Sequence, residues 1–253
     1  MAKRKNNHSH FWLNTFYGQE LSSVEIKQLS IYFRKIFGLN VIQIGNSNID
    51  YLSGNCKINH KIIMVEHLEK LLPRDKDSNV VSVLCSKNEY IPLPTNSVDA
   101  VIIAHGLEFS SNAQAILREV DRILVADGQL IVLGFNPYSL WGLRSVLSSK
   151  KPRGKYPWNG KWLSSHRVMD WLDLLNYEIL NKDYLYFKPC LNHQKFLNFM
   201  RFFEHIGKII PRGSAVYCIN ARKKQEALIP LKIVWKDQAI ISSSATEPTM
   251  KVK

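Results

Sequence analysis

The feature that most constrains this chain is the alternation of short apolar runs with helical patterns. The clearest unit spans residues 98–135, where VDAVIIA and GQLIVLGF flank a segment whose apolar residues recur at helical spacing. Apolar runs of this length, separated by helices, are typical of βαβ units in a parallel sheet. On this basis we predict strands over residues 41–44, 61–65, 80–84, 100–104 and 129–135.

Helices and two further strands complete the pattern. We predict a helix over residues 20–37 that ends at Gly38, one from a Ser111 or Asn112 cap through Leu124 before an Asp127-Gly128 turn, and one over 165–175 capped by Ser164. A short helix is expected in NPYSLWGLRSVL after Phe135. Two last strands are predicted over residues 177–187 and 215–220, with a helical insertion around 196–210 between them.

Length favours one elaborated domain, since 253 residues are too few for two full-sized ones. We expect an N-terminal arm and helix over residues 1–38 and the main domain over 39–221. Insertions or a lid are expected at about 137–163 and 190–212. A basic, partly disordered tail is predicted over residues 222–253.

The cysteines suggest neither a metal site nor a disulfide framework. They lie far apart, with no C-x-x-C pair, so we predict reduced, buried thiols and no bound metal at Cys56, Cys85, Cys190 and Cys218. No stretch reaches the roughly 18 apolar residues of a membrane span, and no signal peptide follows the basic N-terminus. The expected location is the cytoplasm.

Charge is distributed unevenly along the chain. The net charge of +13 divides into +5 over residues 1–88 (12 basic, 7 acidic), −4 over 89–135 (2 and 6) and +12 over 136–253 (20 and 8). The basic excess therefore lies outside the best-patterned segment. It favours an anionic substrate or partner, and it leaves nucleic acid open as a partner.

The segment IPLPTNSVDAVIIAHGLEFSSNAQAILREVDRILVADGQLIVLGFNPYSLWGLR resembles the core of class I, type 11-like S-adenosylmethionine (SAM) dependent methyltransferases. The similarity is greatest to a bacterial branch, of unassigned activity, that carries GFNP-S-xx-GLR after the fifth strand. The resemblance covers about residues 40–145. It implies a Rossmann-like α/β fold with a mostly parallel sheet of about seven strands and flanking helices, and SAM as cofactor.

The resemblance places the cofactor at the turn after the first strand, VIQIGNSNID. Gly45 matches the first glycine of the family's loop, but Asn46, Ser47, Asn48 and Ile49 replace the later glycines. Because Asn tolerates the left-handed backbone region, we expect Asn46 or Asn48 to substitute in part. Two alternatives stay open: a working SAM site and an altered or vacant one.

Two acidic positions bear on the same site. Glu66 lies 21 residues after Gly45 and matches the acceptor of the ribose hydroxyls, although it could equally begin an exposed helix. Lys87 stands where the family often has a carboxylate that contacts adenine, and lysine has no acceptor atom. Glu89 is the nearest replacement, so we add it to the predicted cofactor-binding residues.

His105, Gly106 and Glu108 follow the fourth strand, at the switch point where open α/β sheets bind ligands. We predict catalytic roles for His105, as a general base, and for Glu108. His105 is also a candidate cofactor contact at the rim of the site. The alternative for His105 is a structural role, in which its side chain caps a backbone group.

Asn136 and Tyr138 follow the fifth strand, and we predict that they line the substrate side. Asn136-Pro137-Tyr138 lacks the second proline of the Asn-Pro-Pro-Tyr signature of amino-group methyltransferases and follows a different strand, so that comparison is rejected. The alternative is a turn in which Pro137 starts a helix that buries Leu140, Trp141 and Leu143.

Together these patterns indicate a SAM-dependent methyltransferase of unassigned substrate, acting on a small-molecule or anionic acceptor. The G-x-G-x-x-G of dinucleotide oxidoreductases does not occur. The main alternative is a non-catalytic protein of the same fold that binds RNA or another anion. It would use the basic C-terminal half, where Lys150–Lys161 is interleaved with Tyr156, Trp158 and Trp162.

Overall fold

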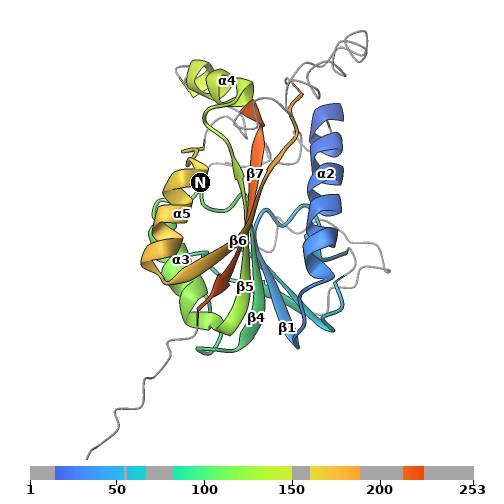
Figure 1. The fold of residues 1–253 in the computed structure, drawn as a ribbon, viewed down its shortest axis with the longest axis vertical. Helices are drawn as coiled ribbons and strands as arrows, with labels where there is room; N and C mark the ends of the chain where they lie inside the picture. The colour runs from blue at the N-terminus through green and yellow to red at the C-terminus, as the bar shows by residue number, and fades with distance from the viewer. Residues whose placement is uncertain (1–14, 54–55, 67–81, 150–159, 189–212, 225–253) are drawn as a thin grey trace, which may run out of the picture.

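The computed structural model describes residues 15–53, 56–66, 82–149, 160–188 and 213–224 (Figure 1). Its elements, in chain order, are α2 (Phe16–Phe33), β1 (Asn40–Gly45), η1 (Tyr51–Ser53), β2 (His60–Val65), β3 (Ser82–Cys85), β4 (Val98–Ala104), α3 (Ala113–Ile123), β5 (Leu124–Phe135), α4 (Leu140–Ser149), α5 (Ser165–Leu174), β6 (Tyr177–Leu185) and β7 (Val216–Lys223). The predicted helix at 196–210, and most of the predicted arm, insertions and tail, lie outside the described residues.

The strands form one seven-stranded sheet in the order β3-β2-β1-β4-β5-β7-β6. Strands β1 to β5 are parallel, and β7 runs antiparallel between β5 and β6. The predicted mostly parallel α/β fold is confirmed. Chain order reverses between β1 and β4, so the residues that follow these two strands meet at the edge where open sheets bind ligands.

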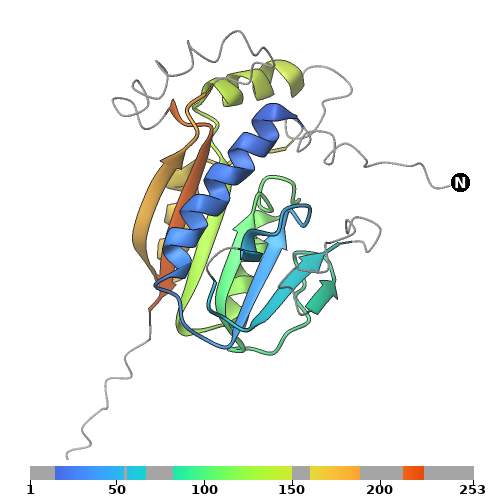
Figure 2. The ribbon, with the colours of Figure 1, turned by 90° about the vertical axis from the view of Figure 1, so that its right-hand side faces the viewer.

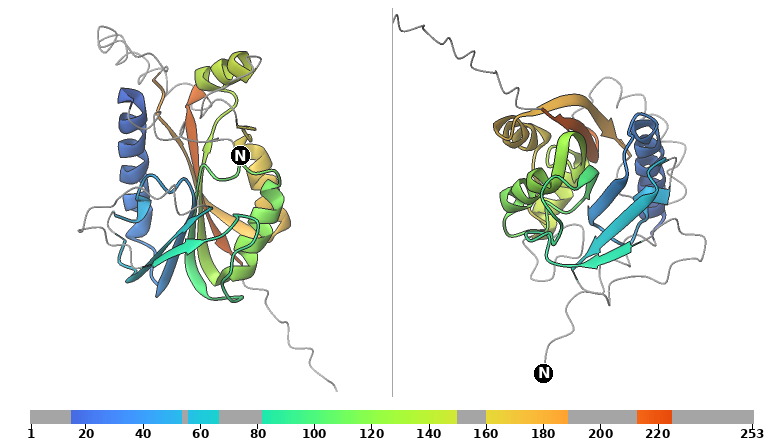
Figure 3. Two further views of the ribbon diagram at one scale, coloured as in Figure 1. Left: turned by 180° about the vertical axis from the view of Figure 1, so that it is seen from behind. Right: turned by 90° about the horizontal axis from the view of Figure 1, so that it is seen from below.

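Helices cover both faces of the sheet. Helix α2 lies against one face, and α3 and α5 lie against the other (Figures 1, 2 and 3). Each face has its own apolar core, one containing Leu29, Phe33 and Trp141 and the other Ile116, Val120 and Leu172. Burial on both faces explains why the central strands read as nearly continuous apolar runs.

Three helix predictions can be compared with the structure. Asn112 accepts from the Ala115 amide and Ser164 from the Arg167 amide, so both predicted caps are confirmed. Helix α2 begins and ends four residues earlier than predicted, which leaves Gly38 outside its cap. Its buried stripe runs through Gly18, Leu21, Glu25 and Leu29, whereas the apolar residues Ile31 and Phe37 are exposed.

Strand β5 and the cysteines differ in part from the predictions. The predicted Asp127-Gly128 turn lies inside the longer β5, where Asp127 has φ +60° and the pairing with β4 shifts register. Cys218 is a buried free thiol as predicted, but Cys85 is exposed and Cys190 lies outside the described residues. Among the described side chains, no cluster could hold a metal ion.

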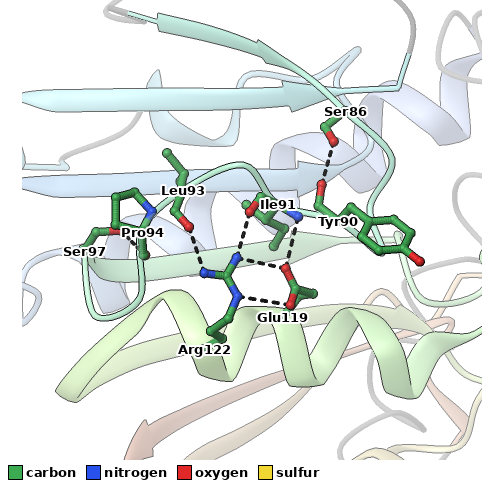
Figure 4. A network of polar contacts seen from close by, with 8 residues as sticks. All are labelled: Ser86, Tyr90, Ile91, Leu93, Pro94, Ser97, Glu119 and Arg122. Atoms are coloured by element: carbon green, nitrogen blue, oxygen red, sulfur yellow. Dashed lines mark hydrogen bonds and ion pairs between the residues drawn. The ribbon is translucent and has the colours of Figure 1, made fainter.

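The IPLP segment before β4 and helix α3 after β4, which both belong to the stretch that resembles the methyltransferase family, are joined by hydrogen bonds. Arg122 of α3 donates to the Leu93 carbonyl (2.8 Å) and the Ile91 carbonyl (2.7 Å), and Glu119 accepts from the Ile91 amide (3.2 Å) (Figure 4). Glu119 also pairs with Arg122 at 2.9 Å. The IPLP segment and the LREVDRIL helix therefore occur together because the helix supplies the polar partners of the segment's backbone.

Candidate cofactor site

The turn after β1 passes very close to the end of β4. The Asn46 amide donates to the Ala104 carbonyl at 2.7 Å, and Gly45 has φ +99°. A Cβ at Gly45 would lie 2.5 Å from the Ala104 oxygen and 2.8 Å from Gly106 Cα. Glycine is therefore required here both for its backbone conformation and for the close approach of β4.

A glutamine side chain fixes the rest of this turn. Gln43 Nε2 donates to the carbonyls of Asn46 (2.8 Å) and Ile49 (2.7 Å), and Oε1 accepts from the Tyr51 amide (3.0 Å). Neither Asn46 nor Asn48 has a positive φ, so the expected left-handed substitution is wrong. Side-chain hydrogen bonds, rather than further glycines, shape the turn.

Two side-chain amide atoms on this turn have no hydrogen-bond partner among the described residues. They are Asn46 Nδ2, a donor on a side chain more than nine-tenths buried, and Asn48 Oδ1, an acceptor. A buried amide group without a partner is costly, so these two atoms are available to bind a polar ligand. The methionine end of SAM carries a carboxylate and an ammonium group, which need a donor and an acceptor respectively. The turn therefore fits the cofactor.

Behind the turn lies a buried charged cluster. His105 Nε2 is 2.9 Å from Glu25 Oε1, and its Nδ1 is 3.7 Å from Glu108 Oε1. The Tyr51 hydroxyl donates to the other Glu25 oxygen at 2.7 Å, and Glu108 Oε1 accepts from the Phe135 amide at 2.7 Å. The two glutamates and the histidine are all almost fully buried. The cluster joins α2, η1 and the ends of β4 and β5.

His105 is held as a cation. Burial acts to lower its pKa, but the charges of Glu25 and Glu108 and the hydrogen bond to Glu25 outweigh burial and raise the pKa to about 10. Its ring stacks on Phe135 with centroids 4.1 Å apart, and its φ is +49°. An imidazolium cannot accept a proton, and neither His105 nor Glu108 is accessible. This geometry argues against the catalytic roles predicted for both residues.

Glu66 lies one residue beyond β2, which neighbours β1. Its carboxylate is exposed and accepts from Asn88 Nδ2 at 3.1 Å. Glu89 points elsewhere, because its Oε1 accepts from the hydroxyls of Ser110 (3.0 Å) and Ser111 (2.8 Å). Hydrogen bonds from Ser111 and Ser110 lower the pKa of Glu89. Glu66 thus lies exposed at the end of β2, while Glu89 links the loops after β3 and β4.

Asn136 has a structural role in the protein. Its Nδ2 donates to the Ser214 carbonyl at 2.9 Å, and its Oδ1 accepts from the Tyr138 amide at 3.1 Å. The bond to Ser214 ties the end of β5 to the residues just before β7, and the bond from Tyr138 closes the turn before α4. Tyr138 is exposed, and α4 begins at Leu140 with Trp141 buried but Leu140 and Leu143 exposed. The alternative in which all three are buried is therefore wrong for both leucines.

Sequence reasoning missed Glu25, Gln43 and Tyr51. Glu25 lies four residues from both Leu21 and Leu29, so a charge on the buried stripe of α2 was the available indication. Gln43 interrupts an otherwise apolar strand in the same way. The sequence does not show which residues Glu25 and Gln43 contact, because these contacts form only when the chain folds.

Comparison with known proteins points to one domain family. Residues 47–132 match the family described as "Methyltransferase domain". The chain is 29% identical over 209 residues to "Uncharacterized protein YafS" of Escherichia coli (82% of this chain, 76% of the relative). It is 32% identical over 68 residues to a ubiquinone/menaquinone biosynthesis C-methyltransferase of Cellvibrio japonicus (27% of each chain).

A solved structure supports the fold. The SAM-dependent methyltransferase of Thermotoga maritima, described as a possible histamine N-methyltransferase, superposes with a TM-score of 0.59 at 18% identity, covering 86% of this chain and 95% of its own. The chain therefore has the Rossmann-like fold of class I methyltransferases, and its matched methyltransferase domain implies S-adenosylmethionine as cofactor.

Proposed function

We propose that this protein is a SAM-dependent methyltransferase that binds its cofactor across the ends of β1, β2 and β4. The observation that carries the proposal is the pair of unsatisfied amide atoms on the turn after β1, Asn46 Nδ2 and Asn48 Oδ1. In this assignment Asn46 donates to the cofactor carboxylate, Asn48 accepts from its ammonium group, and Glu66 accepts from the ribose hydroxyls. The bound cofactor supplies an electrophilic methyl group on a sulfonium.

The protein's own contribution is mainly to orient the cofactor and acceptor, because methyl transfer from a sulfonium is an in-line displacement. Gly45 and Gln43 hold the turn in one conformation, and the Glu25–His105–Glu108 cluster fixes the segment after β4 beneath it. We assign His105 and Glu108 to positioning rather than to proton transfer.

The acceptor is proposed to be a small or anionic molecule, since the segments after β5 carry a net charge of +12. Membership of the bacterial branch with GFNP-S-xx-GLR is part of the same proposal. The alternative of a non-catalytic RNA-binding protein gains no support from the matched domain, and Lys150–Lys155 lie outside the described residues.

An isosteric variant tests the assignment. Asn46→Asp keeps the oxygen that accepts from the Asn48 amide (3.1 Å) but replaces the free donor by an oxygen. We expect SAM affinity to fall about tenfold or more, because a charge-assisted hydrogen bond becomes a repulsion. Asn96→Asp, at an exposed turn before β4, is the matched control. Equal affinity of wild type and Asn46→Asp in calorimetric titration would refute the role of Asn46.

A further inference from the structure

Helix α4 directs apolar side chains outward. Leu140, Leu143 and Val146 recur every three residues and, with Tyr138 before the helix, are between 52% and 75% exposed. Together with Pro137, Ser139 and Gly213, these four residues line a pocket of about 420 Å³. We call Tyr138, Leu140, Leu143 and Val146 the α4 apolar face. A contiguous exposed apolar patch commonly marks a binding surface.

Contacts on the buried side of α4 fix the orientation of the α4 apolar face. Trp141 is buried, its Nε1 donates to the Lys188 carbonyl at 2.9 Å, and its ring meets the rings of Tyr17 and Tyr186 edge-on. Ser145, one turn later, is also buried. Because the inner side of α4 is packed in this way, the helix cannot turn its apolar face inward without losing these contacts.

The charge of the surrounding sequence favours an anionic partner. Residues 136–169 contain seven basic residues and no Asp or Glu; the basic residues are Arg144, Lys150, Lys151, Arg153, Lys155, Lys161 and Arg167. Such a charge disfavours a second copy of the chain, since pairing would bring two basic segments together. An exposed apolar helix face within a strongly basic stretch of sequence is the combination expected of a surface that meets the headgroup and acyl-chain boundary of an anionic bilayer.

The position of α4 in the fold also favours an anionic lipid surface as the partner. Helix α4 lies at the end of the molecule where the parallel strands finish, apart from α3 and α5 (Figures 1 and 3). Among the helices that the structure describes, none is both long and apolar enough to cross a membrane. From these observations we propose that the α4 apolar face docks the protein reversibly on an anionic lipid surface, with the ligand-binding edge of the sheet turned toward the bilayer.

Vesicle co-sedimentation of the full chain tests this docking. We expect binding to vesicles of phosphatidylglycerol and phosphatidylcholine, little binding to phosphatidylcholine alone, and release as salt rises to about 0.5 M, because screening weakens the basic contribution. No binding to the anionic vesicles, or equal binding to both compositions, would overturn the proposal.

The variant Leu140→Ser/Leu143→Ser tests the apolar contribution. We expect vesicle affinity to fall about tenfold or more, while the control Leu39→Ser/Leu174→Ser, with two leucines exposed elsewhere, changes little. Circular dichroism and thermal unfolding verify that both variants fold. Undiminished binding by the first variant would show that α4 does not insert. If the Leu140→Ser/Leu143→Ser variant kept vesicle binding but lost self-association or RNA binding, the α4 apolar face would belong to that other partner.

Discussion

His105 Nε2 lies 2.9 Å from a carboxylate oxygen of Glu25, although 80 residues separate them in the chain. Both side chains are about 1% exposed, so the contact joins α2 to the end of β4 through the interior. An ion pair in such surroundings is costly to form and more costly to break, because the remaining charge is left buried. The pair therefore fastens α2 to the segment that follows β4.

Replacing one member of this pair should destabilise the fold. For Glu25→Gln we expect the free energy of unfolding to fall by about 3–5 kcal/mol, the cost typical of breaking a buried pair. Glu178→Gln is the control, because Glu178 pairs with Arg222 where both side chains are 44% exposed and solvent screens the pair, so it should cost much less than Glu25→Gln. Urea unfolding measures both. Similar losses for the two variants would contradict the assigned burial of the pair.

The raised pKa of His105 predicts how stability depends on pH. Because the pKa of His105 is about 10 when folded and near 6.5 when unfolded, its contribution is complete below pH 6.5 and is lost as pH rises toward 10. We expect stability to fall between pH 7 and 8.5 by up to about 1.4 kcal/mol per pH unit from this group. Nuclear magnetic resonance should show an imidazolium throughout that window. A His105 titration midpoint near 6.5 would contradict the charged cluster.

Gly45 should tolerate a methyl group much less well than Gly106. Gly45→Ala combines a positive φ with a Cβ 2.5 Å from the Ala104 oxygen, so we expect a loss of about 2–5 kcal/mol in stability. Gly106→Ala places its Cβ 3.1 Å from Gly45 Cα with no positive φ, and should cost about 1 kcal/mol. Thermal unfolding of the two variants, side by side, measures the difference. Equal costs would show that the close approach at Gly45 is not constraining.

Replacing Glu66 should weaken cofactor binding more than replacing Glu89. We expect Glu66→Ala to weaken SAM binding by about 1–3 kcal/mol through loss of a charge-assisted hydrogen bond. Glu89→Gln should have a smaller effect, since its carboxylate is already bonded to Ser110 and Ser111. Calorimetric titration of each variant compares them. A larger loss for Glu89→Gln would reverse the assignment.

The sheet was predictable from sequence because its central strands are buried on both faces and each apolar run is bounded by a turn or cap. Strands β1, β2 and β4 were predicted to within two residues at each end, and residue type located the Ser164 cap and narrowed the α3 cap to Ser111 or Asn112, of which the structure shows Asn112. The boundaries of α2 were not, because its buried stripe includes Glu25 and leaves Ile31 exposed.

The candidate site was only partly predictable. Gly45 and Glu66 follow from motif spacing, which depends on local chain geometry. The bonds of Gln43 to the turn and of Glu25 to His105 depend on distant segments, so spacing gave no indication of them. For the same reason His105 was expected to act as a base, whereas two buried carboxylates keep it protonated.

Calorimetric titration of the wild-type chain with SAM, accompanied by thermal unfolding, tests the central claim most directly. A protein that uses Asn46, Asn48 and Glu66 as proposed should bind one SAM per chain and unfold at a higher temperature in its presence, because a ligand that binds only the folded state stabilises that state. Absence of both heat and stabilisation at about 1 mM SAM would contradict the proposed cofactor site.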